Sequence, residues 1–201
     1  MNSDDHPMGT RDRLIGAMLE LLRRKGFHGF GLSDLLARAE APKGVLYHHF
    51  PGGKVELAIA AIEKDVSQII AVLEQLRTRD PDPVQVMRLW LDHAQSRLEE
   101  SGFERGCALG AIALESTAAD LPLRQALNDG FDAIRSTLAG MLAGAGMTKE
   151  KAERFSTLII SAYEGALLQS RVAGSTGPAR ETLEALLHLI QMEMDRERRQ
   201  A

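Results

Sequence analysis

The sequence predicts an all-α protein of about nine helices in two domains. Residues that favour helices, above all Ala, Leu, Glu and Arg, are abundant, whereas aromatic residues make up only 4% of the 201 positions. Apolar residues recur at spacings of three and four along most of the chain, and no stretch shows the period of two that is typical of a strand. Segments rich in Gly, Pro, Ser and Asp interrupt this pattern and divide it into helices.

Three short helices are expected near the start of the chain. Thr10 is a good N-cap for the first of them, and Gly26 follows its last residue as a C-cap. Pro42 stands at or beside the first position of the third helix, where its missing N–H costs nothing. The sequence Pro51-Gly52-Gly53 ends this helix. The expected ranges are Thr10–Lys25, Leu32–Ala39 and about Lys43–Phe50.

Six further helices are expected after residue 54, separated by breaks such as Asp80-Pro81-Asp82-Pro83 and Gly144-Ala145-Gly146. Thr148 is the expected N-cap of the fifth of them. We expect an N-terminal domain over residues 1–54 and a C-terminal domain over residues 55–201. The expected helices are Lys54 to about Arg77, Val84–Leu98, Gly106–Ser116, Leu121 to about Ala143, Thr148–Val172 and Ala179–Arg199. The repeating pattern of the first of these consists of Leu57, Ala58, Ala61, Ile62, Asp65, Ile69, Val72, Leu73 and Leu76.

Composition and motifs exclude several classes of protein. No apolar run reaches the 18 residues of a membrane span, and residues 1–6 lack the pattern of a signal peptide, so the cytoplasm is the expected location. The single cysteine, Cys107, cannot form an intrachain disulfide or a multi-cysteine metal site. The chain has no Gly-rich phosphate loop, no His-x-x-x-His spacing and no evident nucleophile–base pair. We therefore expect no enzyme, no cofactor and no metal.

The charge is distributed unevenly between the two expected domains. Residues 1–54 carry a net charge of +2, or +4 without the two acidic residues that precede Thr10, whereas the rest carries −6. A basic unit ahead of an acidic body is typical of a nucleic-acid reader on a non-binding domain, although a difference this small also arises by chance.

Residues 32–50 have the spacing of a helix-turn-helix motif, in which two short helices are joined by a tight turn. The second helix of such a motif enters the major groove of DNA by its N-terminal end. This end offers Lys43 to phosphate, Gly44 for a close approach, and Tyr47 and His48 one turn later. Amides at the start of the next helix, together with Lys54, form a second phosphate anchor. A helical hairpin without a partner remains the alternative.

Residues Thr10–Leu57 resemble the N-terminal domain of the TetR family of repressors, and the segment APKGVLYHHFPGGK at residues 41–54 carries most of the resemblance. Its second half is similar to the branch of LmrA/YxaF-type regulators. Residues 106–110, GCALG, resemble a segment found in several branches. The resemblance implies an all-helical homodimer that binds a palindromic operator in double-stranded DNA. It also implies a ligand in the C-terminal domain that moves the two DNA-binding units apart and releases the DNA.

The resemblance also assigns roles to individual residues. The implied DNA contacts are Ser33, Pro42, Lys43, Gly44, Tyr47, His48 and Lys54. The sequence departs from the family at Glu40, because many members have Gly at this turn. A left-handed backbone at this position costs a residue other than glycine roughly 1 kcal/mol, so either Glu40 tolerates this strain or the turn differs slightly from that of the family.

The C-terminal domain holds candidates for a ligand cavity of roughly a few hundred Å³, mostly apolar, for a flat or lipophilic effector. The candidates are Trp90, His93, Cys107, Phe131, Tyr163 and Gln169. Plain core packing is the alternative for each of them. Cys107 lies near Arg105, which would lower its pKa, so a thiol that senses oxidants or electrophiles is a second alternative. An inert buried cysteine is a third.

The last two helices carry apolar stripes that predict a dimer interface, in which two helices from each chain form a four-helix bundle. The interface candidates are Leu158, Ala162, Ala166, Leu183, Leu187 and Ile190. Burial within one chain is the alternative for part of each stripe. The sequence thus predicts a ligand-responsive transcriptional repressor. The alternatives are a redox-sensing repressor that uses Cys107 and a helical interaction protein that does not bind DNA.

Overall fold

The computed structural model describes residues 9–200, and within this range the chain forms nine α-helices and no strand, as the sequence predicts. The expected absence of a signal peptide at residues 1–6 lies outside the described residues. The helices are α1 Thr10–Lys25, α2 Leu32–Ala39, α3 Lys43–His49, α4 Gly53–Arg79, α5 Pro83–Glu100, α6 Ala108–Glu115, α7 Leu121–Gly144, α8 Lys149–Ala173 and α9 Gly177–Gln200.

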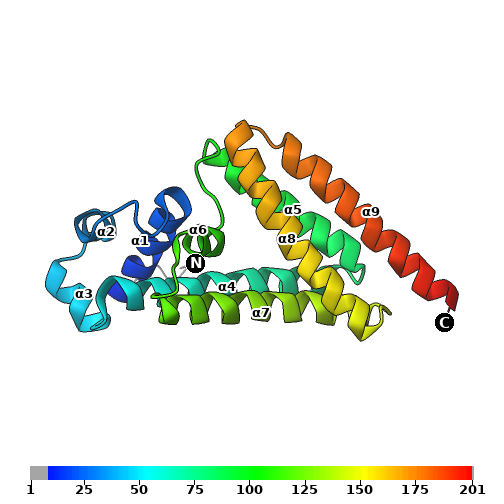
Figure 1. The fold of residues 1–201 in the computed structure, drawn as a ribbon, viewed down its shortest axis with the longest axis horizontal. Helices are drawn as coiled ribbons and strands as arrows, with labels where there is room; N and C mark the ends of the chain where they lie inside the picture. Colours follow the sequence, from blue (N-terminus) through cyan, green and yellow to red (C-terminus); the bar gives the residue numbers. More distant parts are fainter. Residues whose placement is uncertain (1–8, 201) are drawn as a thin grey trace, which may run out of the picture.

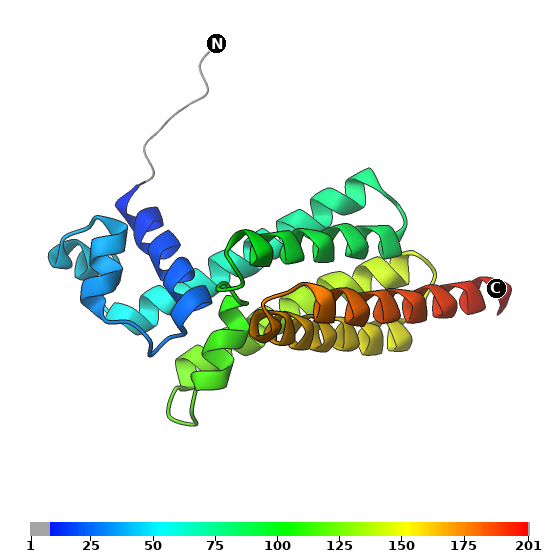
Figure 2. The ribbon, with the colours of Figure 1, turned by 90° about the horizontal axis from the view of Figure 1, so that it is seen from above.

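The first three helices form a small unit at one end of an elongated molecule (Figure 1). The long helix α4 runs from this unit along α7 into the larger part of the molecule, while α8 and α9 pack side by side (Figures 1 and 2). The short helix α6 lies between the two parts and packs on both α1 and α7. Because α4 passes without a break through residues 54 and 55, the two expected domains share this helix. The division into residues 1–54 and 55–201 stays a prediction.

The helix ends lie within two residues of the expected ones, and three of them show local details that the sequence did not predict. Gly9 is the N-cap of α1, so Thr10 is its first helical residue and not the cap. Phe50 lies just beyond the end of α3, with its N–H bonded to the carbonyl of Leu46 at 2.8 Å. Thr148 is the N-cap of α8, as expected, but its hydroxyl makes no capping hydrogen bond.

The apolar stripe of α9 packs into the core of its own chain. Leu183, Leu187 and Ile190 are almost completely buried, and so is Ala166 on α8. The pattern of spacing shows that these residues share a face, but α5 and α8 cover that face within the chain. They are therefore core residues of the single chain, which is the alternative that the sequence left open for part of each stripe.

No helix in residues 9–200 combines the length and the apolar character that a membrane crossing requires.

Candidate DNA-binding surface and effector pocket

The helix-turn-helix geometry of α2 and α3 depends on buried apolar anchors. Leu35 of α2, Leu46 of α3 and Phe50 are almost inaccessible, and they pack with the apolar face of α1 in one core. Asp34 accepts a hydrogen bond from the backbone N–H of Gly31 at 3.0 Å and so caps the start of α2. These contacts fix which face of α3 points away from the protein.

Glu40 ends α2 in the left-handed conformation, so of the two alternatives the glutamate tolerates the strain. Its φ and ψ angles are 49° and 46°. The N–H of Glu40 donates to the carbonyl of Ala37 at 3.3 Å, and the N–H of Ala41 donates to the carbonyl of Leu36 at 3.1 Å. The turn therefore keeps a glycine-type geometry with a glutamate in it, and the exposed carboxylate lies just before α3.

We expect Glu40→Gly to stabilise the protein and to tighten DNA binding. Removal of the left-handed strain is worth about 1 kcal/mol, which raises the melting temperature by roughly 2–4 °C for a chain of this length. Glu40→Gln is the matched control, because it removes the charge but keeps the strain. Thermal unfolding and a gel shift separate the two effects. A Gly variant that melts no higher than the Gln variant would contradict the strain argument.

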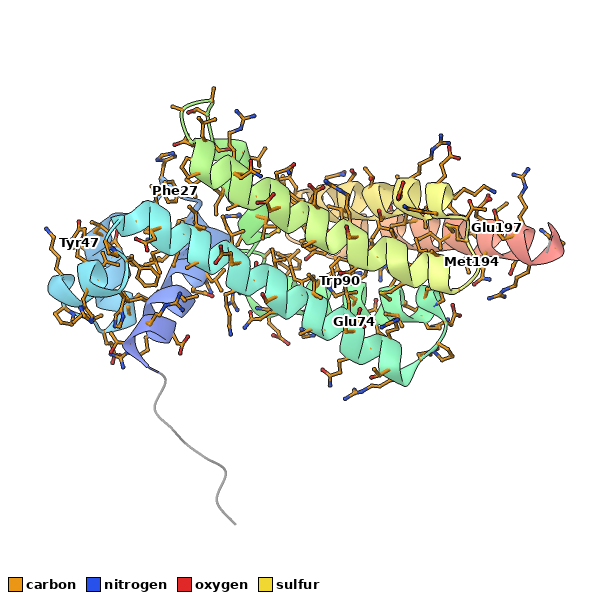
Figure 3. The ribbon with its side chains drawn as sticks, turned by 90° about the horizontal axis from the view of Figure 1, so that it is seen from below. Phe27, Tyr47, Glu74, Trp90, Met194 and Glu197 are labelled. Atoms are coloured by element: carbon orange, nitrogen blue, oxygen red, sulfur yellow. The ribbon has the colours of Figure 1, made fainter. Side chains whose placement is uncertain are left out.

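The residues predicted to contact DNA, apart from Lys54, lie exposed on the outer side of the helix-turn-helix. Tyr47 is 44% exposed and lies at the end of the molecule far from Trp90 (Figure 3). No atom lies within 4 Å of a Cβ built on Gly44, so this face is open. The other exposed residues of the predicted set are Ser33, Pro42, Lys43 and His48.

Lys54 has a different place from the one predicted. Its Nζ donates to the carbonyls of Phe27 at 2.5 Å and Phe30 at 2.7 Å. It also lies 4.0 Å from the centre of the Phe30 ring and 4.6 Å from that of Phe27. Burial lowers the pKa of this ammonium group. Lys54 thus holds the loop between α1 and α2 on the start of α4, and its contact with phosphate stays a prediction.

A buried ion pair joins the DNA-binding unit to the larger part of the molecule. The guanidinium of Arg23, in the last turn of α1, binds the carboxylate of Asp65 on α4. Asp65 is only 4% exposed. The carbonyl of Arg23 also accepts a hydrogen bond from the N–H of Gly106 at 2.9 Å, so the loop before α6 contacts the same turn.

Glu115 makes a second connection, from the end of α6 to the loop after α1. Its Oε2 accepts hydrogen bonds from the N–H groups of Phe27 at 2.6 Å and His28 at 2.8 Å. Gly26 makes room for this contact, because a Cβ at residue 26 would lie 1.9 Å from Oε1 of Glu115. Gly26 also has a φ of +70°, so both its backbone and its surroundings require glycine.

A third connection is centred on Glu20 of α1, which is buried among arginines. Its carboxylate binds Arg24 and Arg105, and it lies 3.6 Å from a nitrogen of Arg38. These contacts lower the pKa of Glu20 against the opposing effect of burial, which is the largest single influence. Arg105 precedes α6, so this cluster also couples the small unit to the larger one.

A cavity of about 110 Å³ lies between α1, α4, α5, α8 and the loop before α6. It brings together four of the predicted ligand residues, Trp90, His93, Cys107 and Tyr163. The rings of Trp90 and Tyr163 are stacked, with centroids 4.8 Å apart. Burial raises the pKa of Tyr163 well above its ordinary value, so the phenol stays neutral. The cavity therefore offers a flat aromatic wall.

The cavity differs from the expected one in size, in charge and in two of its residues. It is smaller than expected and has charged walls, formed by Arg23, Asp65, Arg97 and Arg105. Phe131 is half-buried on α7, which contributes nothing to the lining. Gln169 is exposed on α8, because six residues of helix turn it well away from the direction of Tyr163. The sequence did not predict the arginines that line the cavity. Asp65 stands at a buried position of an apolar pattern, and a buried carboxylate needs a positively charged partner, so it was a signal for at least one of them.

Cys107 lies in an environment that disfavours a reactive thiolate. Burial raises the pKa of its thiol well above the ordinary value, and the neighbouring carboxyl of Glu164 raises it further. The expected lowering by Arg105 is therefore wrong in direction. Because the thiolate is the nucleophile, this environment argues against rapid reaction with oxidants or electrophiles.

Two comparisons with known proteins agree with this geometry. Residues 14–61 match the family described as bacterial regulatory proteins, tetR family. Residues 83–185 match the C-terminal domain described as transcriptional regulator LmrA/YxaF-like. The chain belongs to the TetR family of transcriptional regulators. Proteins of this family bind DNA through a helix-turn-helix and are not enzymes, as the sequence predicts.

Relatives of this TetR-family protein cover nearly its whole length. It is 30% identical to the HTH-type transcriptional regulator YxaF of Bacillus subtilis, over 80% of this chain and 84% of YxaF. It is 28% identical to the HTH-type transcriptional regulator LmrA of the same organism, over 84% of this chain and 90% of LmrA. The crystal structure of a TetR regulatory protein from Rhodobacter sphaeroides has the same fold, with a TM-score of 0.79, 24% identity and coverage of 89% and 97%.

Proposed function

We propose that this TetR-family regulator is a repressor that binds a palindromic operator as a homodimer and leaves it when a small molecule enters the cavity. The observation that carries the DNA-binding part is the outward face of α3, where Lys43, Tyr47 and His48 are exposed while Leu46 is buried. A helix held in this way presents its N-terminal end to the major groove. The resemblance to TetR repressors supports repression, and a regulator that binds bacterial DNA acts in the cytoplasm.

Exposed apolar side chains on α8 and α9 support the homodimer. Leu158, Leu168 and Val172 recur on one side of α8, and Val172 is 83% exposed. Leu189 and Met192 lie together on α9 and are about half exposed. Two such helices from each chain would form a four-helix bundle about a twofold axis. We therefore replace most of the interface predicted from the sequence.

Of the original interface residues, Leu158 keeps its proposed role, and Ala162 lies half-buried beside it. The revised interface consists of Leu158, Ala162, Leu168, Val172, Leu189 and Met192. It uses the faces of α8 and α9 that the core of the chain leaves uncovered.

The position of the cavity supports control by a small molecule. Arg23 belongs both to the cavity wall and to α1, so the cavity borders the DNA-binding unit directly. A ligand that changes the contacts of Arg23 changes how α1 sits on α4. Such a ligand releases DNA only if it binds the non-binding arrangement more tightly than the binding one.

The DNA-binding proposal is tested with the DNA upstream of the gene for this protein. Lys43→Ala should weaken binding to every sequence and reduce the slope of affinity against salt by about one unit, as expected for one phosphate contact. Tyr47→Ala should cost on the order of 1–3 kcal/mol of binding free energy if it contacts a base. Lys149→Ala removes an equivalent exposed charge at the start of α8 and is the matched control. Gel shifts over a range of salt concentrations measure all three.

Unchanged affinity in both DNA-face variants would contradict the proposal and would favour a helical interaction protein. A reporter gene placed downstream of the same DNA tests whether the protein represses or activates transcription. Its expression should fall when the protein is present, and a rise would contradict the repressor role.

A further inference from the structure

The cavity carries more positive charge than its own residues neutralise. Arg23, Arg97 and Arg105 line it, against the single carboxylate of Asp65. Asp65 is already bound to Arg23. Arg97 makes no hydrogen bond or ion pair with any of residues 9–200. Arg97 is exposed at the mouth of the cavity, and Asp65, the one carboxylate of the described residues whose charge acts on it, is already paired with Arg23.

Arg105, which also lines the cavity, has a buried N–H group without a hydrogen-bond partner in residues 9–200. One of its terminal nitrogens binds Glu20, but its Nε is buried without a hydrogen-bond partner among the described residues. A buried N–H without an acceptor is costly, and it is rare in folded proteins. The Nε itself is enclosed, whereas the Arg105 side chain as a whole is 32% exposed and lines the cavity beside Arg97.

The charges around Arg97 favour an anion in the cavity. Burial lowers the pKa of Arg97, and the charges of Arg23 and Arg105 lower it further. The other nearby acid, Glu164, does not correct the imbalance. Burial raises the pKa of Glu164, which favours its neutral form. An anion in the cavity would relieve the repulsion between the arginines.

The rest of the wall is apolar and flat. Ile69, Val72 and Leu167 line it together with the stacked rings of Trp90 and Tyr163. A volume of about 110 Å³ holds on the order of ten atoms the size of a water molecule. This is room for a small molecule with a single ring and not for a nucleotide.

We propose that the cavity binds a small monocarboxylate with a flat apolar body, held by its carboxylate between Arg97 and Arg105. Guanidinium groups bind planar carboxylates through paired, charge-assisted hydrogen bonds. The apolar body then lies against Trp90 and the aliphatic side chains. A cation is excluded by the three arginines, and the apolar wall disfavours a fully hydrated phosphate. This inference rests on the proposed function, because it names the chemical class of the effector for the same cavity.

The experiment compares carboxylates with uncharged molecules of the same shape. The probes are benzoate and phenylacetate, their amides benzamide and phenylacetamide, and inorganic phosphate. We expect both carboxylates to raise the melting temperature and to bind measurably by calorimetry, whereas the amides and phosphate do not. Arg97→Gln should weaken carboxylate binding by about tenfold or more, since it removes one charged partner.

Two further variants serve as controls. Arg88→Gln removes an exposed arginine of the same helix that does not line the cavity, so it should bind carboxylates as the wild type does. Arg97→Lys keeps the charge but loses the paired geometry, so its affinity should fall between those of wild type and Arg97→Gln. It also keeps the test valid if Arg97→Gln does not fold.

Several outcomes would overturn the inference. These are equal binding of an amide and its carboxylate, full carboxylate affinity in Arg97→Gln, phosphate binding in preference to carboxylates, or no binding of either carboxylate. Operator binding by the unliganded protein is measured in parallel. If it is intact while the carboxylates fail, only this inference is wrong; if it is absent, the proposed DNA-binding function fails.

Discussion

Asp65→Asn should lower the free energy of unfolding by about 3–5 kcal/mol, because it leaves the guanidinium of Arg23 buried without its counter-charge. The change keeps the shape of the side chain, removes the charge and replaces one acceptor oxygen with an NH₂ donor. A loss of this size is a large part of the roughly 5–15 kcal/mol that stabilises a typical protein. For a chain of this length it lowers the melting temperature by roughly 6–20 °C. Thermal unfolding followed by circular dichroism measures the effect.

Asp132→Asn is the matched control, because Asp132 pairs with Arg135 on the exposed surface of α7. Surface pairs of this kind are worth about 0–1 kcal/mol, so the control should melt close to the wild type. A double variant, Arg23→Met with Asp65→Leu, replaces both charges with apolar groups and should recover most of the lost stability. Equal melting of Asp65→Asn and Asp132→Asn would show that the buried pair is not important for stability.

Leu168→Glu should abolish dimerisation and with it most of the affinity for the operator. Leu168 is 54% exposed in the single chain, so a glutamate is tolerated there until two chains associate. In the proposed four-helix bundle it would place unpaired charges in an apolar interface, which costs several kcal/mol. The loss of the second DNA-binding unit then reduces operator affinity by about 10²–10⁴. Sedimentation measures the mass in solution, and gel shifts measure the affinity.

Leu114→Glu is the control for this variant, because Leu114 is also an exposed leucine but lies on α6, outside the proposed interface. It should remain a dimer and bind the operator. If Leu168→Glu is still a dimer with full operator affinity, the interface lies elsewhere. If the wild type is a monomer at micromolar concentration, the dimer proposal is wrong.

Sequence reasoning located the helices and the helix-turn-helix because these depend on local signals. The spacing of apolar residues, the break after Phe50 and the turn at Glu40 all act within a few residues of the chain. The left-handed conformation of Glu40 was one of two alternatives that these local signals left open. Local patterns of this kind determine which residues are helical and where a helix stops.

The same reasoning failed wherever the partner of a side chain is distant in sequence. Spacing showed that Leu183 and Ile190 share a face of α9, but not that α5 and α8 cover that face. A lysine at the start of a helix is a typical phosphate anchor, but the ammonium group of Lys54 binds the carbonyls of two residues more than twenty positions earlier. Arg97 and Arg105 look like surface residues in a linear sequence, and only the fold brings them to one cavity.

The continuity of α4 limits where this protein can be divided or recombined. Leu57, Ala58, Ala61 and Ile62 are fully buried, and α4 packs on both α1 and α7. These residues complete the core of the DNA-binding unit, although they lie after the boundary that the sequence suggested. A fragment that stops at residue 54 would lose one wall of that core. A chimaera that joins this unit to the sensor of another regulator must therefore carry α4 at least as far as Ile62.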